Sequence, residues 1–312
     1  MAGILSMTSF GFLADGDAEA GGLSPRIKLG AFTAGLPWGF ENIDSYAALT
    51  GHAPAIIHWF QDWKMDFDPS YLDQASSRGA MPLITWEPWD WDGSEKNQPR
   101  YSLRRILSGA HDAYIMSWAR GAAAWGRRFY LRFAPEMNGD WRPWSPGVNG
   151  NTARQYVEVW RKLHSMFRRA GATNVRWVWC PIVHYAGSTP FEKVFPGDSY
   201  VDWIGLDGYN WGSLHPWSGW QSAGEIFSCS YRMAARLSSK PIMIPEVAST
   251  ELGGNKARWI ERALLEEIPS RFPRVKAIVW FDADKETDWR VNSSSASLEA
   301  WRRAASSPLY RR

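Results

Sequence analysis

The chain has 312 residues, of which 45% are hydrophobic and 21% are charged, and its 35 Lys and Arg against 32 Asp and Glu leave a formal net charge of +3. This balance supplies ample material for a core and excludes a chain that is disordered throughout. No block of about five or six like charges is present, so nothing indicates nucleic-acid binding. No apolar stretch reaches the roughly 18 residues of a membrane span, so no membrane partner is expected.

Two features bear on redox state and location. Cys180 and Cys229 are too few for a disulfide scaffold and lack metal-ligand spacing, so both are expected to be free thiols.

Residues 1–24 are interpreted as an N-terminal extension that is a remnant of a signal peptide, because they are apolar and end in small residues but have no basic start. A secreted or extracytoplasmic location is therefore expected, without a clear signal peptide.

Short apolar runs alternate with longer amphipathic segments along the rest of the chain. Runs of this kind, bounded by turn residues, are typical of buried strands. Strands are predicted at 27–35, 53–60, 80–87, 127–136, 174–181, 201–209, 240–248 and 275–283. The clearest helix patterns are 102–126, 151–171, 222–239 and 255–273. Asn151 or Thr152 can cap the second of these helices, and Gly171 can end it.

This alternation predicts an α/β fold. Strands that alternate with helices form βα units around a parallel sheet, and eight of them fit a closed (β/α)8 TIM barrel in a single domain of residues 25–312. An open, doubly wound sheet is the competing arrangement. It would normally carry a Gly-rich phosphate turn after its first strand, and the segment GAFTAGLPWGF does not match that pattern.

Most of the 21 Trp lie at or just after the ends of the predicted strands. In a barrel these ends share one face, where binding and catalytic groups gather. An indole ring suits the similarly amphipathic face of a sugar ring, so the pattern favours a carbohydrate cleft, with packing beneath long loops as the alternative for many of the rings. These residues are Trp38, Trp59, Trp63, Trp86, Trp89, Trp91, Trp141, Trp144, Trp179, Trp211, Trp217, Trp220, Trp280 and Trp289.

Two acids end two of the predicted strands. Glu136, in RFAPEMNGDWRPW, ends the fourth, and Glu246, in PIMIPEVAST, ends the seventh. Glycoside hydrolysis needs such a pair, because one carboxylic acid protonates the leaving oxygen while a second carboxylate attacks the anomeric carbon or activates water. A metal site is an alternative, but the strand ends offer mainly Trp, Asn and Tyr. A second alternative is that Glu136 or Glu246 forms an ion pair that only stabilises the fold.

These stretches, together with VDWIGLDGYNWG and AIVWFDADKETDWR, resemble glycoside hydrolase family 26, a family of retaining barrel glycosidases of clan A. The resemblance runs from about residue 28 to residue 302, and EMNG followed by two Trp is its most specific part. It implies that Glu136 is the acid/base and Glu246 the nucleophile. The implied fold is the same barrel, with no cofactor and no metal.

The resemblance also implies roles for residues around the acids. Arg132 would hold a carboxylate or the proximal sugar, and Asp207 and Tyr209 would orient and stabilise Glu246. Trp280 would form the floor of the subsite next to the cleaved bond.

Further candidates come from their positions near the strand ends. Glu87 is expected to touch sugar hydroxyls or to form a supporting ion pair, and Asn138 to bind sugar or to hold the turn after Glu136. Sugar platforms or contacts are expected from Trp86, Trp141, Trp144 and Trp211. Supporting or loop-shaping roles are expected for His58, His184, Asp282 and Asp284.

The residue before Glu136 bears on the substrate. Many mannan-cleaving members of the family have His at this place, whereas Pro135 has neither a side-chain donor nor an N–H. The expected activity is a retaining endo-β-glycanase acting on β-1,4-mannan, and mixed-linkage β-1,3-1,4-glucan, β-1,3-xylan and an exopolysaccharide stay open as substrates. A catalytically inactive barrel that binds glycan is the non-enzymatic alternative. The expected partner is a β-linked polysaccharide or oligosaccharide, and the expected state is a monomer.

Overall fold

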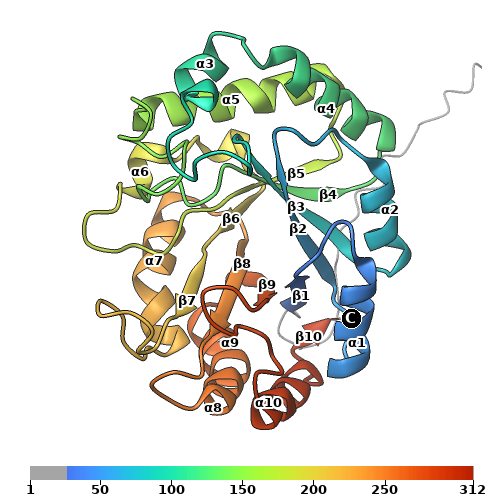
Figure 1. Cartoon of the computed structure of the whole chain (residues 1–312), viewed down its shortest axis with the longest axis vertical. Coiled ribbons are helices and arrows are strands. Elements are labelled where there is room, and N and C mark those ends of the chain that lie inside the picture. Colours follow the sequence, from blue (N-terminus) through green and yellow to red (C-terminus); the bar gives the residue numbers. More distant parts are fainter. Residues whose placement is uncertain (1–26, 312) are drawn as a thin grey trace, which may run out of the picture.

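The computed structural model describes residues 27–311, which form a closed barrel of parallel strands inside a ring of helices (Figure 1). The expected signal remnant in residues 1–24 lies outside the described residues. From β1 to β6 each strand pairs with the next, β6 then pairs with β8, and β9 closes the barrel by pairing with both β8 and β1. The strands are β1 (Ile27–Thr33), β2 (Ile56–Asp62), β3 (Met81–Glu87), β4 (Phe129–Phe133), β5 (Val175–Trp179), β6 (Trp203–Gly205), β7 (Gly208–Asn210), β8 (Ile242–Ser249), β9 (Val275–Asp282) and β10 (Tyr310–Arg311).

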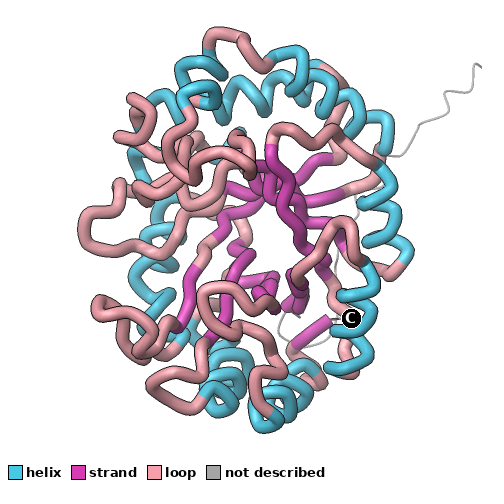
Figure 2. Tube along the Cα trace, in the orientation of Figure 1, coloured by secondary structure: helices cyan, strands magenta, loops and turns pink. Residues whose placement is uncertain are grey.

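Helices cover the outside of the barrel and loops crowd its rim (Figure 2). Within the described part of the chain, no helix is both long enough and apolar enough to cross a bilayer. The longer helices are α1 (Phe40–Thr50), α2 (Pro69–Ser77), α4 (Asp112–Trp125), α5 (Ala153–Arg169), α7 (Ala223–Leu237) and α10 (Ser295–Ala305). The shorter ones are η1 (Pro99–Tyr101), α3 (Leu103–Leu107), α6 (Phe191–Val194), η2 (Asp198–Tyr200), α8 (Lys256–Glu261), η3 (Arg262–Glu267) and α9 (Ile268–Arg271).

The predicted barrel is confirmed, with local differences. The expected sixth strand is divided into β6 and β7, which both pair with β8. The helix expected over 102–126 is divided into α3 and α4, because Gly109 adopts a φ of 91° in the turn between them. The expected cap of α5 is Thr152, whose side chain forms a capping box with Gln155. β10, which pairs with β1, was not predicted.

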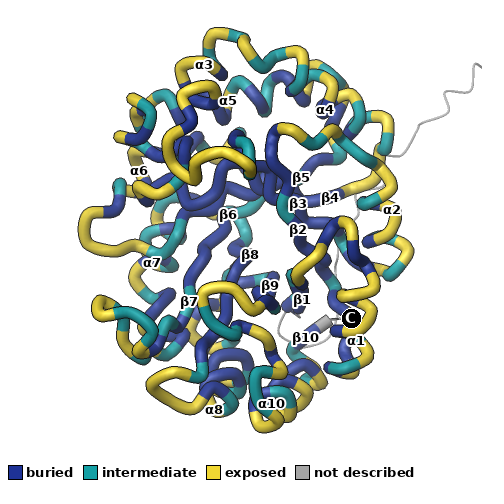
Figure 3. The backbone as a smooth tube through the Cα atoms, in the orientation of Figure 1, coloured by how far each residue is buried: buried dark blue, intermediate teal, exposed yellow. Residues whose placement is uncertain are grey.

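The alternation of side chains along each strand decides what faces the barrel interior. A compact cluster fills the interior and includes one or two residues from most of the strands, as expected when every second side chain points inward. Its buried members are Ile56, Leu83, Tyr130, Val178, Cys180, Met243, Ala277 and Val279. The outward-facing strand side chains pack against the helices, which makes both faces of the sheet buried (Figure 3).

This alternation corrects the sugar contacts expected of Trp86 and Trp280. Both side chains point out of the barrel toward the helices, and both are fully buried. Trp86 stacks on Trp118 of α4 with ring centroids 4.7 Å apart, and Trp280 packs at 5.0 Å from Trp301 of α10. In β9 the inward neighbour, Phe281, reaches the mouth of the barrel instead.

A β-bulge in β8 turns Glu246 inward. Ile244 pairs with Ile278 and Val247 with Trp280, so Pro245 and Glu246 together stand opposite the single residue Val279. Such an extra residue bends a strand and re-aims a side chain. β8 then continues to Ser249 beside β7, which places Glu246 within the strand and not at its end.

We expect Trp86→Ala to lower the free energy of unfolding by about 3–5 kcal/mol, the usual cost of truncating a fully buried Trp. The matched control is Trp38→Ala, which removes a ring that is 61% exposed and should change stability by no more than about 0.5 kcal/mol. Urea denaturation of both variants measures the difference. Equal, small losses would contradict the outward, buried position of Trp86.

Candidate active site

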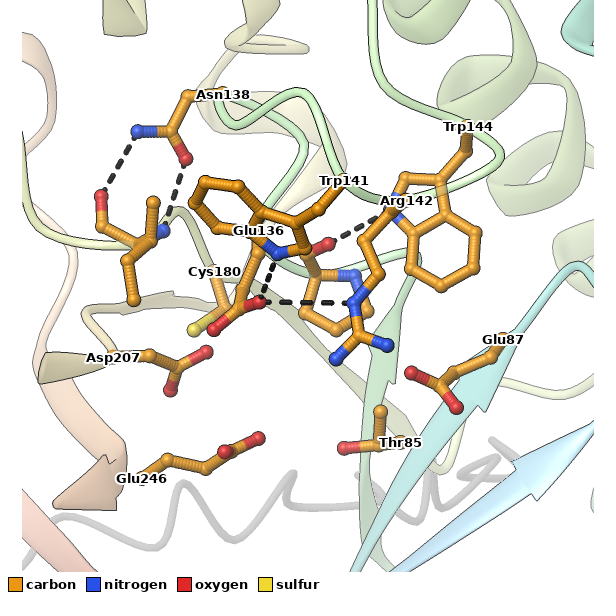
Figure 4. A network of polar contacts seen from close by, with 12 residues as sticks. Thr85, Glu87, Glu136, Asn138, Trp141, Arg142, Trp144, Cys180, Asp207 and Glu246 are labelled. Carbon is orange, nitrogen blue, oxygen red and sulfur yellow. Dashed lines mark hydrogen bonds and ion pairs between the residues drawn. The ribbon is translucent and has the colours of Figure 1, made fainter. Parts of the chain in front are cut away.

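Glu136 and Glu246 lie at the same mouth of the barrel, one from the loop after β4 and the other from β8 (Figure 4). Each is 8% exposed, so both carboxyl groups are largely withdrawn from water. Figure 4 shows them turned toward the same space, with Asp207 and Thr85 beside them. The sequence placed both acids at this mouth, and the structure brings them together.

The backbone that presents Glu136 is strained. β4 ends at Phe133, three residues before the position predicted, and the chain then adopts positive φ angles of 44° at Ala134 and 55° at Glu136. A residue other than Gly in such a conformation costs on the order of 1–3 kcal/mol and commonly marks a functional site. The N–H of Glu136 donates to the carbonyl of Cys180 at 2.8 Å, which ties this turn to the end of β5.

The carboxyl group of Glu136 has one close donor and one distant cation. Trp141 Nε1 donates to its Oε2 at 2.9 Å, and Arg142 Nε lies 3.7 Å from the same oxygen. Burial raises the pKa of Glu136 above its ordinary value, Arg142 opposes this shift, and the nearby Glu246 adds to it. The arrangement favours a protonated Glu136.

Glu246 is held differently, because both of its oxygens accept hydrogen bonds. Arg132 Nη2 donates to Oε1 and the Tyr209 hydroxyl donates to Oε2. Charge-assisted bonds of this kind are among the strongest in proteins, and they fix the orientation of a carboxylate.

Arg132 is the centre of this network and has no exposed surface. Its Nη1 donates to Asp207 Oδ2 at 2.7 Å and its Nε to Thr85 Oγ1 at 2.7 Å, while its guanidinium lies 5.6 Å from the ring of Phe60. Burial disfavours its charge, but Asp207 and Glu246 together hold the pKa of Arg132 well above its ordinary value. Arg132 therefore holds two carboxylates.

Arg132, Asp207 and Tyr209 all belong to the hydrogen-bond network around Glu246. Tyr209 bonds Glu246 directly, and Asp207 acts through Arg132. Arg132 has no surface open to a sugar, so of its two expected roles the structure shows the one toward a carboxylate, and Asp207 is buried as completely. His58 lies behind Thr85, with Nε2 at 2.7 Å from its hydroxyl, and burial followed by the charge of Arg132 holds the pKa of His58 well below its ordinary value.

Asn138 shows the second of its two expected roles, and the sugar contact expected of Trp144 is corrected. Asn138 is 1% exposed, its amide donates to the carbonyl of Ile182 at 2.9 Å, and its oxygen accepts from the N–H of the same residue at 2.9 Å. It therefore clamps the loops after β4 and β5. Trp144 is fully buried and donates to the carbonyl of Pro135 at 2.7 Å, which supports the turn that carries Glu136.

Trp141 and Trp211 remain available to a ligand. Trp141 is 37% exposed and stacks with Tyr185 at 5.9 Å between ring centroids, while Trp211 is half-buried beside Tyr209. Tyr185 was not a sequence candidate, and only its position shortly after β5 could have suggested it.

Glu87 stands at the end of β3 and is 2% exposed. Its Oε2 accepts from Trp89 Nε1 at 3.1 Å and Trp91 Nε1 at 3.2 Å, while its Oε1 has no hydrogen-bond partner among the described residues. Arg142 lies between Glu87 and Glu136 (Figure 4). Burial disfavours its charge, but Glu87, Glu136 and Glu246 together hold the pKa of Arg142 above its ordinary value. Sequence reasoning missed Arg142, whose only signal was a lone base between two Trp.

The supporting residues expected near other strand ends shape loops. Asp282 Oδ1 accepts from the N–H of Val291 at 2.7 Å, and Asp284 lies 3.6 Å from Arg290. His184 Nδ1 is 2.9 Å from the hydroxyl of Ser188. Both cysteines are free thiols, as expected, with Cys180 buried and Cys229 exposed.

Comparison with known proteins gives the family. The model of glycosyl hydrolase family 26 matches residues 128–296, which contain Glu136, Arg132, Asp207 and Glu246. The chain belongs to glycosyl hydrolase family 26. The resemblance predicted from the sequence is therefore confirmed.

Relatives within the family carry several names. Endoglucanase H of Acetivibrio thermocellus is 40% identical over 290 residues, which are 91% of this chain and 31% of that protein. A β-1,3-xylanase of Vibrio sp, TXYA, is 26% identical over 152 residues, which are 46% of this chain and 28% of that protein. This family 26 chain thus spans less than a third of the length of the curated relatives it matches.

Solved structures support the fold. A family 26 β-mannanase from Bacteroides ovatus superimposes with a TM-score of 0.69 at 18% identity, covering 92% of this chain and 90% of that one. At this identity the likeness shows the barrel alone. Among residues 27–311, no three His, Cys, Asp or Glu side chains group in a way that could hold a metal ion.

We expect the pKa of Glu136 to lie above that of an exposed glutamate and to rise further in Arg142→Met, because this variant removes the cation that opposes the effect of burial. Carbon-13 NMR titration of labelled glutamate carboxyl groups measures both values. The matched control is Arg154→Met, which removes an exposed base paired with Glu158 and should leave Glu136 unchanged. A fall in the pKa of Glu136 in Arg142→Met would contradict this electrostatic picture.

Proposed function

We propose that the chain is a retaining endo-β-glycanase in which Glu136 is the acid/base and Glu246 the nucleophile. The observation that carries the proposal is the contrast between two carboxyl groups at one barrel mouth. Glu246 accepts hydrogen bonds at both oxygens, one of them from a buried arginine, while burial favours the protonated form of Glu136. Two carboxyl groups in such different surroundings can divide the acid and nucleophile roles.

The first step follows from this division. Glu136 donates its proton to the glycosidic oxygen as the bond from that oxygen to the anomeric carbon breaks, and an oxygen of Glu246 forms a new bond to the same carbon. The leaving sugar departs as an alcohol, and the retained sugar is an ester of Glu246. Tyr209 and Arg132 hold the Glu246 carboxylate in one orientation, which favours attack from a fixed position.

The second step reverses the roles. Once Glu246 is esterified its negative charge is gone, and Glu136, now a carboxylate beside Arg142, takes a proton from water. The resulting hydroxide oxygen attacks the anomeric carbon, the ester bond breaks, and Glu246 returns to its carboxylate form. Two inversions leave the anomeric configuration unchanged.

For the substrate we propose a β-glucan, with β-1,4-mannan and β-1,3-xylan as competitors. Two observations support this order. The relative that is 40% identical is named an endoglucanase. The position before the acid/base is Pro135, whose carbonyl accepts from Trp144 and which has no donor to give a sugar. Since polysaccharides do not cross membranes unaided, we also propose that the protein acts outside the cytoplasm.

We expect Glu136→Ala to reduce kcat/KM on a polysaccharide by at least about a hundredfold, because the natural leaving group needs the proton that Glu136 supplies. On an aryl β-glycoside with a good leaving group the first step should be far less affected. Glu246→Ala should lose at least about a thousandfold on both substrates, since no covalent capture is possible. Steady-state kinetics on both substrates measure the pattern.

A control for both variants is Asp284→Ala, which removes an exposed carboxylate on the same face and should alter neither rate substantially. Equal losses on the two substrates in Glu136→Ala would contradict its role as the acid. A Glu246→Ala variant that kept about a tenth of the rate would contradict the nucleophile assignment.

We expect the β-anomer to form first when wild-type enzyme cleaves a β-glucan, because double displacement retains configuration. Proton NMR recorded before mutarotation measures the first anomer. The same assay on mixed-linkage glucan, β-1,4-mannan and β-1,3-xylan ranks the substrates. An α-anomer formed first would exclude the covalent route, and binding without cleavage on every glycan would favour an inactive glycan-binding barrel.

A further inference from the structure

Two tryptophans at the barrel mouth expose far more of their rings than packing requires. Trp217, in the loop after β7, is 71% exposed, and Trp38, in the loop after β1, is 61% exposed. Covering the exposed face of an indole with an apolar ligand surface is favourable by roughly 25 cal/mol for each Å² removed from water. The ring neighbours of these residues include Trp91 for Trp38 and Trp211 for Trp217, and neither ring contacts Glu136 or Glu246, so the reaction itself does not account for them.

The loop that carries Trp217 is held in a fixed shape. The Ser218 hydroxyl donates to the carbonyl of Gly212 at 2.8 Å, and the N–H of His215 donates to the Ser218 hydroxyl at 3.1 Å. His215 stacks against Trp217 with centroids 4.8 Å apart and planes at 17°. His215 therefore backs one face of the indole and leaves the opposite face open.

Trp217 is connected to the acids through other aromatic rings. Its centroid lies 5.8 Å from that of Trp211, which lies 5.6 Å from that of Tyr209, and the Tyr209 hydroxyl bonds Glu246. These contacts form a continuous aromatic path that runs outward from the nucleophile.

Trp38 ends a second path from the same mouth. Its ring packs edge-on to Trp91 at 6.2 Å, and Trp91 Nε1 donates to Glu87 Oε2 at 3.2 Å. The turn beneath it is closed by the N–H groups of Trp38 and Gly39, which both donate to the carbonyl of Gly35 at 2.9 Å. Trp38 is thus also presented by an ordered loop.

The two paths leave the mouth on different sides. In the strand order of the barrel, three pairings separate β1 from β7, through β9 and β8, and the remaining strands lie on the other side. Figure 1 shows the loop between β1 and α1 on the right and the loop between β7 and α7 on the left. A ligand that covered both rings would have to be long, and it would pass the mouth beside β8, the strand that carries Glu246.

We propose that Trp217, backed by His215, and Trp38 are outer sugar-binding platforms for one extended β-linked glycan, whose middle lies over Glu136 and Glu246. This inference deepens the proposed function and rests on it. The chemistry is that of a flat apolar ring against the C–H face of a pyranose, and separated single rings suit a repeating sugar chain better than they suit the contiguous apolar patch of a protein partner.

The experiment compares Trp217→Ala, Trp38→Ala and the double variant with wild type on a ladder of oligosaccharides from one β-glucan. The quantity measured is the ratio of kcat/KM on the longest to that on the shortest oligosaccharide cleaved. Each single variant should lower this ratio by about tenfold, the usual effect of truncating an aromatic anchor, and the double variant should lower it further. Trp217→Phe, which keeps a flat ring, should restore most of it.

The matched control is Trp125→Ala, which removes a partly exposed indole on α4, paired with Asp73 and far in sequence from either loop. It should leave the ratio unchanged. An unchanged ratio in both Trp217→Ala and Trp38→Ala, with wild type still favouring long chains, would overturn the platforms while leaving the proposed function intact.

Calorimetric binding of soluble β-glucan to Glu246→Ala, with and without each Trp substitution, separates the two failures. If wild type hydrolyses no glycan, the proposed function fails, yet weaker binding in the Trp217→Ala background would still support the platforms. Equal binding in all backgrounds, or no binding in any, would overturn them.

Discussion

The buried guanidinium of Arg132 is the charge around which the active end of the barrel is organised. A cation without exposed surface is stable only if it is paired and its N–H groups are bonded. Asp207, Glu246 and Thr85 meet that demand from three different strands or strand ends. The same bonds fix the position of Glu246, so the requirement to neutralise one interior charge also positions the proposed nucleophile.

The contrast between Glu136 and Glu246 follows from the different partners of their carboxyl groups. Glu246 has the arginine and the tyrosine hydroxyl, whereas Glu136 has an indole N–H and a base at 3.7 Å. Both carboxyl groups are equally buried, so the two acids differ in their hydrogen-bond and ion-pair partners and not in their exposure to water. Arg142 opposes the effect of burial on Glu136, and it is itself kept charged by Glu87 as well as by Glu136.

The alternation of apolar and amphipathic segments was enough to predict the barrel, and the position of Glu136 and Glu246 near strand ends was enough to predict the mouth. What the sequence did not reveal was side-chain direction. Trp86 and Trp280 face the helices because side chains alternate along a strand. Glu246 faces inward because of a β-bulge, which regular alternation does not predict. Asn138 and Trp144 satisfy backbone groups of loops whose shape depends on contacts distant in sequence. Arg142 gave too little local signal to be noticed.

The positive φ of Glu136 sets its proposed role as the acid/base against the stability of the fold at a single position. Glycine is the residue that this backbone conformation favours, since it has no Cβ to clash with the preceding carbonyl. Selection for thermal resistance alone would therefore tend to replace the acid there, and selection for turnover would restore it. With Glu136 the chain is less stable than it would be with Gly at the same position. Protein engineering that ranks substitutions by folding free energy alone would therefore favour replacing Glu136.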